Sequence, residues 1–294
     1  MLKSNSIENY WKTLESKKPV PKFVKKINII EFDKLKKSIN CKNEIFVKNL
    51  ARRMYNGEAF IVRNAAKKNL KGIMLNLAKH YDKKQKPSFH KMLDDTPNFH
   101  RIIDKKITKK YSLYAIKHSY FLYNWNIKSK LEKDFKKGVY RHWRYVKFLA
   151  GNSKFQYEKN IPSQMQIDRL QIVNYPHGGG ELRDHVDPRK NQRVVSGLIM
   201  SKKGVDFDQG GFYFRGKNYK KLNIEDRLEI GDSVIFYGSI VHGVEKVDKN
   251  KKLDWKSYDG RWFIGMFVNE SNHVKNRITA SDLSNSTNFK KKAS

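Results

Sequence analysis

Along the second half of the chain, apolar and polar residues alternate in short runs of the kind that form β-strands. From about residue 165 these runs are separated by glycine-containing turns such as PHGGG, DQGG and EIGD. Alternation with a period of two places the apolar side chains on one face of a strand. The runs are RLQIVNY, ELRDHVD, VVSGLIMS, GGFYFRG, DSVIFYG, HGVEKV and RWFIGMFVN. So many short strands in succession are typical of an antiparallel sandwich or a jelly-roll barrel.

The first half of the chain favours helices instead. EAFIVRN, from residue 58, predicts one short strand, and the apolar residues of the following stretch AAKKNLKGIMLNLAKHY recur at the spacing of one helix face. The stretch KSKLEKDFKKGVYRHWRYVKFLAGN predicts a second helix that ends near Gly151. Residues 83–110 contain two prolines and broken patterns, so we expect a long loop with short helical turns there. The pattern of the aromatic stretch YSLYAIKHSYFLYNWN does not distinguish between a helix and a strand.

These patterns divide the chain into three parts. Residues 1–57 are polar and basic and predict a helical N-terminal extension, residues 58–270 predict one domain with its β core at about 165–269, and residues 271–294 predict a flexible polar tail. The predicted fold class is therefore mainly β with α, in which helices from the first half pack on the outside of the barrel.

Candidate metal ligands lie on two of the predicted strands. In a strand, residues i and i+2 project from the same face, so His185 and Asp187 point the same way. His242 lies at the end of a strand near the far end of the predicted sheet, and in a jelly roll this strand and that of His185 can lie side by side. Two histidines and one carboxylate occupy one face of an octahedral ion, which is the ligand set associated with non-haem Fe(II) that activates oxygen.

Further motifs follow in a fixed order: Tyr-Pro-x-Gly-Gly before the His-Val-Asp triplet, then GGFYF, LEIGDSVIF, VHGVEKV and an arginine at the start of the last long strand. This order resembles the Fe(II)/2-oxoglutarate-dependent oxygenases, in particular their prolyl-hydroxylase-like branch. The resemblance covers residues 165–269 and, weakly, the GEAFIVRNAA stretch. It implies a double-stranded β-helix core, that is, a cupin-like jelly roll, and Fe(II) bound by His185, Asp187 and His242.

The resemblance also assigns two residues to the cosubstrate. Arg261 matches the residue whose guanidinium binds the far carboxylate of 2-oxoglutarate, and Tyr175 matches a tyrosine that can hydrogen-bond it; an ordinary core tyrosine is the alternative. Arg261 shares a strand face with Phe263, and we expect its burial there to require an anion. An insertion at residues 248–260 separates Arg261 from His242 more widely than is usual in the family, and we expect an extended loop that leaves Arg261 in place.

The implied activity is that of a dioxygenase. The resemblance implies that O2 and 2-oxoglutarate are consumed, that succinate and CO2 are released, and that an unactivated C–H bond is hydroxylated. Because Asp187 stands where halogenases of the family carry a small residue, hydroxylation is favoured over chlorination, and desaturation or ring closure stays open. The expected substrate is a small metabolite, such as an amino acid or a secondary metabolite; the alternatives are a protein side chain or nucleic acid, and a non-catalytic jelly-roll module that binds a polyanion.

Composition adds limits on partners and ligands. The formal net charge of +33 makes a polyanion or protein partner possible, but the lysines are scattered along the chain, which favours compositional drift. Cys41 is the only cysteine, so any metal must be held by histidines and carboxylates. Arg183, Arg189 and Arg193 flank the triplet and are candidates for binding an acidic or zwitterionic substrate, with solvated surface charge as the alternative. No signal-like or membrane-spanning apolar run is present, so we expect a cytoplasmic protein without a membrane span.

Overall fold

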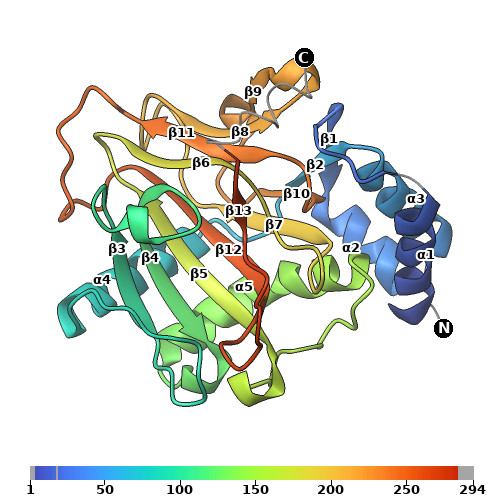
Figure 1. Cartoon of the computed structure of the whole chain (residues 1–294), viewed down its shortest axis with the longest axis horizontal. Helices are drawn as coiled ribbons and strands as arrows, with labels where there is room; N and C mark the ends of the chain where they lie inside the picture. Colours follow the sequence, from blue (N-terminus) through green and yellow to red (C-terminus); the bar gives the residue numbers. More distant parts are fainter. Residues whose placement is uncertain (1–3, 18, 284–294) are drawn as a thin grey trace.

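A β-barrel flanked by helices forms the body of the protein (Figure 1). The structure is a computed structural model, and it describes residues 4–17 and 19–283. The strands are β1 (Lys26–Glu31), β2 (Glu58–Arg63), β3 (Phe99–Ile103), β4 (Ala115–Tyr123), β5 (Gln166–Tyr175), β6 (Gly180–Val186), β7 (Val194–Ile199), β8 (Gly211–Arg215), β9 (Lys221–Asn223), β10 (Ser233–Tyr237), β11 (His242–Val247), β12 (Arg261–Glu270) and β13 (Ser281–Asp282). The helices are α1 (Ser4–Lys17), α2 (Phe32–Asn40), α3 (Glu44–Tyr55), α4 (Leu70–Lys84) and α5 (Lys130–Leu149).

The strands are hydrogen-bonded in the order β1-β2-β10-β7-β12-β5-β4-β6-β11-β8-β9, and β3 and β13 pair with β4 and β6. β4 joins two halves of this arrangement: a larger sheet with β1, β2, β10, β7, β12, β5 and β3, and a smaller sheet with β6, β11, β8, β9 and β13. Its first residues, Ala115 and Ile116, pair with β6, whereas residues 118–123 pair with β5. The inner faces of the two sheets enclose an interior whose wall includes residues of β4, β5, β6, β7, β8, β10, β11 and β12.

All seven predicted strand runs of the second half are strands, namely β5, β6, β7, β8, β10, β11 and β12. The predicted strand and helices of the first half are found as β2, α4 and α5. Five strands were not predicted. β1 lies in the N-terminal extension and pairs in parallel with β2, and β3 lies within the expected loop of residues 83–110. β4 lies in the aromatic stretch whose type the sequence left open, and β9 and β13 are only three and two residues long. β1 and β3 pair with strands that are distant in sequence, which local patterns do not show.

The helices cover the outer face of the larger sheet. α5 packs against β7, and it begins with a capping box in which Ser129 and Glu132 satisfy each other's backbone amides. His142 on this helix is fully buried, and its Nε2 lies 3.1 Å from the Ser196 hydroxyl of β7. Since the large apolar core lies between helices and sheet, the barrel interior carries only a small apolar cluster and leaves room for a cavity.

Residues 271–283 run from β12 back to β6 (Figure 1). β13 pairs with β6 through Ser281 and Asp282, and the Asp282 carboxylate accepts a hydrogen bond of 2.9 Å from the amide of Tyr114. The amide of Leu283 donates to the carbonyl of Asp184 at 2.8 Å. We predicted a flexible tail over residues 271–294; its described part is hydrogen-bonded to the barrel, and residues 284–294 lie outside the described residues.

Candidate active site

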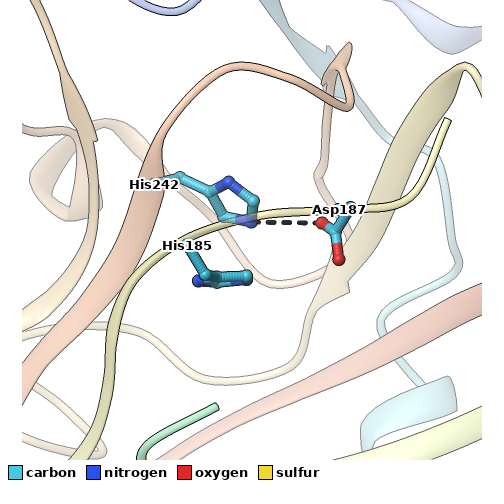
Figure 2. A group of neighbouring side chains, drawn as sticks. All are labelled: His185, Asp187 and His242. Carbon is cyan, nitrogen blue, oxygen red and sulfur yellow. Dashed lines mark ion pairs between the residues drawn. The ribbon is translucent and has the colours of Figure 1, made fainter. Parts of the chain in front are cut away.

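The three predicted metal ligands meet inside the barrel. His185 lies near the end of β6, and His242 begins β11, where the two residues are direct cross-strand partners. Asp187 follows β6, and its amide donates a hydrogen bond of 2.9 Å to the carbonyl of Gly238. One possible ligand atom from each of the three side chains lies within 4.8 Å of the others. Figure 2 shows the two imidazole rings and the carboxylate converging from these segments.

Hydrogen bonds orient both imidazole rings. Nδ1 of His185 lies 2.9 Å from the carbonyl of Arg183, and Nδ1 of His242 lies 2.9 Å from the carbonyl of Ile240. A carbonyl can only accept, so Nδ1 carries a proton in each ring and Nε2 is the nitrogen left for a metal ion. Such bonds to the second ring nitrogen are typical of metal-binding histidines.

The charge states of the triad also suit a cation. Burial, followed by the neighbouring His242, lowers the pKa of His185 to about 4, so this ring is neutral near pH 7. Burial raises the pKa of Asp187, but the hydrogen bond with His242 and the electrostatic influence of His242, His185 and Lys117 together hold that pKa below its ordinary value. The Asp187 carboxylate lies 3.4 Å from Nε2 of His242. Two imidazole nitrogens and one carboxylate are a ligand set that fits a divalent metal ion such as Fe(II).

The triad opens onto a cavity of about 290 Å³ in the barrel interior. Arg261, the first residue of β12, lies in its wall and is only 1% exposed. Its Nε donates to the carboxylate of Glu225 at 2.9 Å, the one hydrogen bond that its guanidinium makes with the described residues. We expected the burial of Arg261 to require an anion; Glu225 of the chain itself provides one, so burial alone does not indicate a ligand. The terminal nitrogens remain available to a carboxylate.

Tyr175 lies directly across from Arg261 in the β5–β12 pair. Its ring stacks on Phe263, with 5.9 Å between centroids, and its hydroxyl is buried without a hydrogen-bond partner among the described residues. Burial raises the pKa of Tyr175, so the hydroxyl is protonated. An unpaired buried hydroxyl is costly, which favours a polar ligand atom beside it.

The three arginines proposed for the substrate do not line this cavity. Arg183 lies over the ring of Tyr114, 3.6 Å from its centroid, and lines a different surface depression. Arg189 and Arg193 line a depression on the other side of Asp187, where Arg193 forms an ion pair with Glu15 at 3.0 Å. Their role in substrate binding stays a prediction.

Other polar residues line the cavity and were not predicted. They are Lys117 on β4, Arg169 and Gln171 on β5, and Arg277 from the segment after β12. Arg169, Gln171, Val173 and Tyr175 follow one another at intervals of two residues along β5, so the period of the strand could have placed Arg169 and Gln171 on the same face as Tyr175. Lys117 and Arg277 lie in segments whose structure the sequence left open or placed in the tail.

Comparison with known proteins supports the fold. No protein-family model matches the chain, and no curated protein matches it. Among solved structures, a full-length Neurospora crassa protein in complex with alpha-KG and 5-formyluracil is similar with a TM-score of 0.50 at 13% identity, over 84% of this chain and 85% of that chain. A Pseudomonas putida prolyl-4-hydroxylase has a TM-score of 0.44 at 11% identity, over 71% of this chain and 91% of that chain.

At such low identity the likeness concerns the fold alone. The predicted fold class, mainly β with α around a jelly-roll core, is confirmed. The resemblance to Fe(II)/2-oxoglutarate-dependent oxygenases thus holds for the fold, and the three residues that it assigns to the metal lie together in the barrel.

Proposed function

We propose that the protein is an Fe(II)- and 2-oxoglutarate-dependent dioxygenase that hydroxylates an unactivated C–H bond of a small metabolite, such as an amino acid or a secondary metabolite. The observation that carries this proposal is the triad of His185, Asp187 and His242, which has both Nε2 atoms available and faces a cavity inside a jelly roll. Fe(II) together with 2-oxoglutarate and O2 supplies the oxidising power, and 2-oxoglutarate leaves as succinate and CO2.

The residues of the chain would bind, orient and shield the reactants. The triad would hold the metal on one side and leave its cavity side open. The terminal nitrogens of Arg261 would bind the far carboxylate of 2-oxoglutarate, and the Tyr175 hydroxyl would donate a hydrogen bond to it. Phe212 and Phe263 line the same cavity and would exclude water from it.

The size of the cavity supports a small substrate. About 290 Å³ is at the lower end of the range for small-molecule sites, and 2-oxoglutarate would occupy part of it. A protein side chain or a nucleobase as the target, or a module that only binds a polyanion, remain the alternative functions. None of the described helices has the length and apolar run needed to cross a bilayer.

The test uses anaerobic protein that is given Fe(II) and 2-oxoglutarate and then exposed to O2. We expect slow succinate release without a prime substrate, and at least a hundredfold less from the His185→Ala and Asp187→Ala variants. Metal content after dialysis, measured by atomic absorption, should fall in the same two variants.

A matched control is His80→Ala, because His80 is exposed on α4 and lies outside the cavity. This variant should keep both the metal and the succinate release. Equal succinate release by the wild-type protein and the His185→Ala variant would contradict the proposed function.

A further inference from the structure

We propose that the prime substrate carries a carboxylate or a phosphate group, which Arg169 binds together with Lys117 and Arg277 at the end of the cavity opposite Arg261. This inference rests on the proposed function, because it assigns a chemical class to the substrate of the same site. None of these three cations is among the proposed metal ligands His185, Asp187 and His242, so metal binding does not explain their presence in the cavity wall.

The two ends of the cavity are separated along the β5–β12 pair. Arg261 pairs with Tyr175 at one end, and Phe267 pairs with Arg169 at the other. Six residues at about 3.3 Å per residue place these ends about 20 Å apart along the strands. A cosubstrate held by Arg261 therefore does not reach Arg169 when it also binds the metal.

The cations at the far end have no acidic group in direct contact, although Asp187 acts on Lys117 and Arg169, and Glu270 acts on Arg277, from a greater distance. Lys117, Arg169 and Arg277 form no ion pair with any residue between 4 and 283 that the structure describes. The Lys117 ammonium also makes no hydrogen bond within that part of the chain. Arg169 donates from Nη2 to the side chain of Gln171 at 3.1 Å, while its Nε is buried without a partner. Arg277 reaches only neutral oxygens, those of Glu270 (backbone) and Asn272.

Aromatic contacts do not replace the missing anion. The Arg169 guanidinium lies 5.1 Å from the ring centroids of both Phe121 and Phe267. Such contacts are weaker than the cost of taking a charge out of water. Burial lowers the pKa of Lys117 to about 8, with Arg169 and Arg101 adding to the effect. Placing Lys117, Arg169 and Arg277 in the cavity wall therefore costs free energy, and an anionic ligand would offset that cost.

The charge balance of the cavity wall points the same way. Asp187 is the one carboxylate among the described wall residues. Arg261 already has Glu225 as its counterion. A dianionic cosubstrate would balance the divalent metal, so Asp187 would be the one negative charge left against the three positive charges of Lys117, Arg169 and Arg277. The wall would therefore keep an excess of positive charge for the prime substrate.

The test is a calorimetric titration of anaerobic protein loaded with Fe(II) and saturating 2-oxoglutarate. The probes are benzoate and phenylphosphonate, each compared with neutral benzamide, which has the same ring. We expect at least one anion to bind ten or more times as tightly as benzamide to the wild-type protein. The Arg169→Met and Lys117→Met variants should lose most of this preference.

Control variants separate charge from packing. Arg169→Lys keeps the charge and should keep part of the preference, and Lys34→Met, at an exposed position on α2, should keep all of it. If the Arg169→Met variant does not fold, the Arg277→Gln variant is used instead, because Arg277 lines the cavity but does not lie on a barrel strand. Its loss of preference for the anion over benzamide is then compared with the wild-type protein. The proposal is overturned if neither anion binds more tightly than benzamide, or if the preference survives in both Arg169→Met and Lys117→Met.

Repeating the titrations on metal-free protein separates this proposal from the proposed function. An anion preference that depends on Arg169, in a protein without 2-oxoglutarate-dependent succinate release, would refute the oxygenase and leave the anion site standing. Succinate release without any anion preference would refute the anion site alone.

Discussion

Glu225 and Arg261 form a fully buried ion pair in the wall of the cavity. Glu225 also accepts a hydrogen bond of 2.6 Å from the amide of Phe212, so one carboxylate supports both the arginine and the start of β8. A buried pair is stable only while both charges are present, because removal of one leaves the other unpaired in a medium of low dielectric constant. The position of Arg261 therefore depends on a residue that no metal or cosubstrate motif contains.

We expect the Glu225→Gln variant to have a free energy of unfolding lower by about 3 kcal/mol, since the Arg261 charge loses its counterion. The same variant should bind 2-oxoglutarate more tightly, because the uncompensated guanidinium attracts an anion more strongly. Urea unfolding and calorimetry measure the two effects. Unchanged stability would show that the pair contributes little.

His142 makes the free energy of unfolding depend on pH. Burial lowers its pKa to about 3, from an ordinary value of 6.5, so the ring is neutral in the folded protein. The unfolded chain takes up a proton below pH 6.5, and the stability that the neutral ring contributes is lost as the pH falls from there toward 3. Between pH 7.5 and pH 5 this amounts to about 2 kcal/mol.

The His142→Gln variant should therefore lose less stability on acidification than the wild-type protein, by about 2 kcal/mol between those two pH values. Urea unfolding at pH 7.5 and at pH 5 measures the difference for each protein. Because His118 and His185 also have lowered pKa values, the wild-type protein keeps a further pH dependence in both measurements. Equal losses in the variant and the wild-type protein would contradict the assignment.

At the scale of elements, the sequence predicted most strands of the barrel but neither β1, β3 nor the type of β4. Period-two alternation and glycine turns are strong in the second half, and they place His185, Asp187 and His242 on strands that can lie side by side. β1 is stabilised by pairing with β2, and β3 by pairing with β4, and local patterns do not show pairing between distant segments. For the same reason the sequence did not reveal the contact of Glu225 with Arg261, or the cavity position of Lys117.

The attachment of residues 271–283 can be tested at Asp282. The Asp282→Ala variant loses the carboxylate that accepts from the amide of Tyr114, a hydrogen bond worth about 1 kcal/mol. We expect faster hydrogen exchange in residues 271–283 and in β6, and unchanged exchange in α5. Uniformly faster exchange over the whole chain would instead indicate a global loss of stability.

At the scale of the whole molecule, the charge of +33 is distributed over helices, strands and loops alike. Many of the lysines are exposed, and several form surface ion pairs such as Lys202 with Glu229 at 2.8 Å. A diffuse positive surface attracts polyanions without a specific site. The division into an extension, a barrel domain and a tail remains a prediction, although β1 of the extension is part of the sheet.

We expect heparin and duplex DNA to bind weakly and to lose at least tenfold in affinity between 50 and 200 mM salt, as for non-specific counterion release. Fluorescence anisotropy at the two salt concentrations measures this change. Affinity that barely depends on salt would contradict binding by scattered lysines and would favour a defined polyanion site.

The segment of residues 271–283 has a consequence for how this protein can diversify. It supplies Arg277, Thr279 and Ala280 to the cavity wall, whereas its pairing with β6 is made by Ser281 and Asp282 of β13. Substitutions at the three wall positions can therefore change which molecules the cavity accepts while the pairing of β13 with β6 is kept. Over evolutionary time, substrate preference can drift there independently of the reaction, and exchanging the segment between related chains offers a route to altered selectivity in the laboratory.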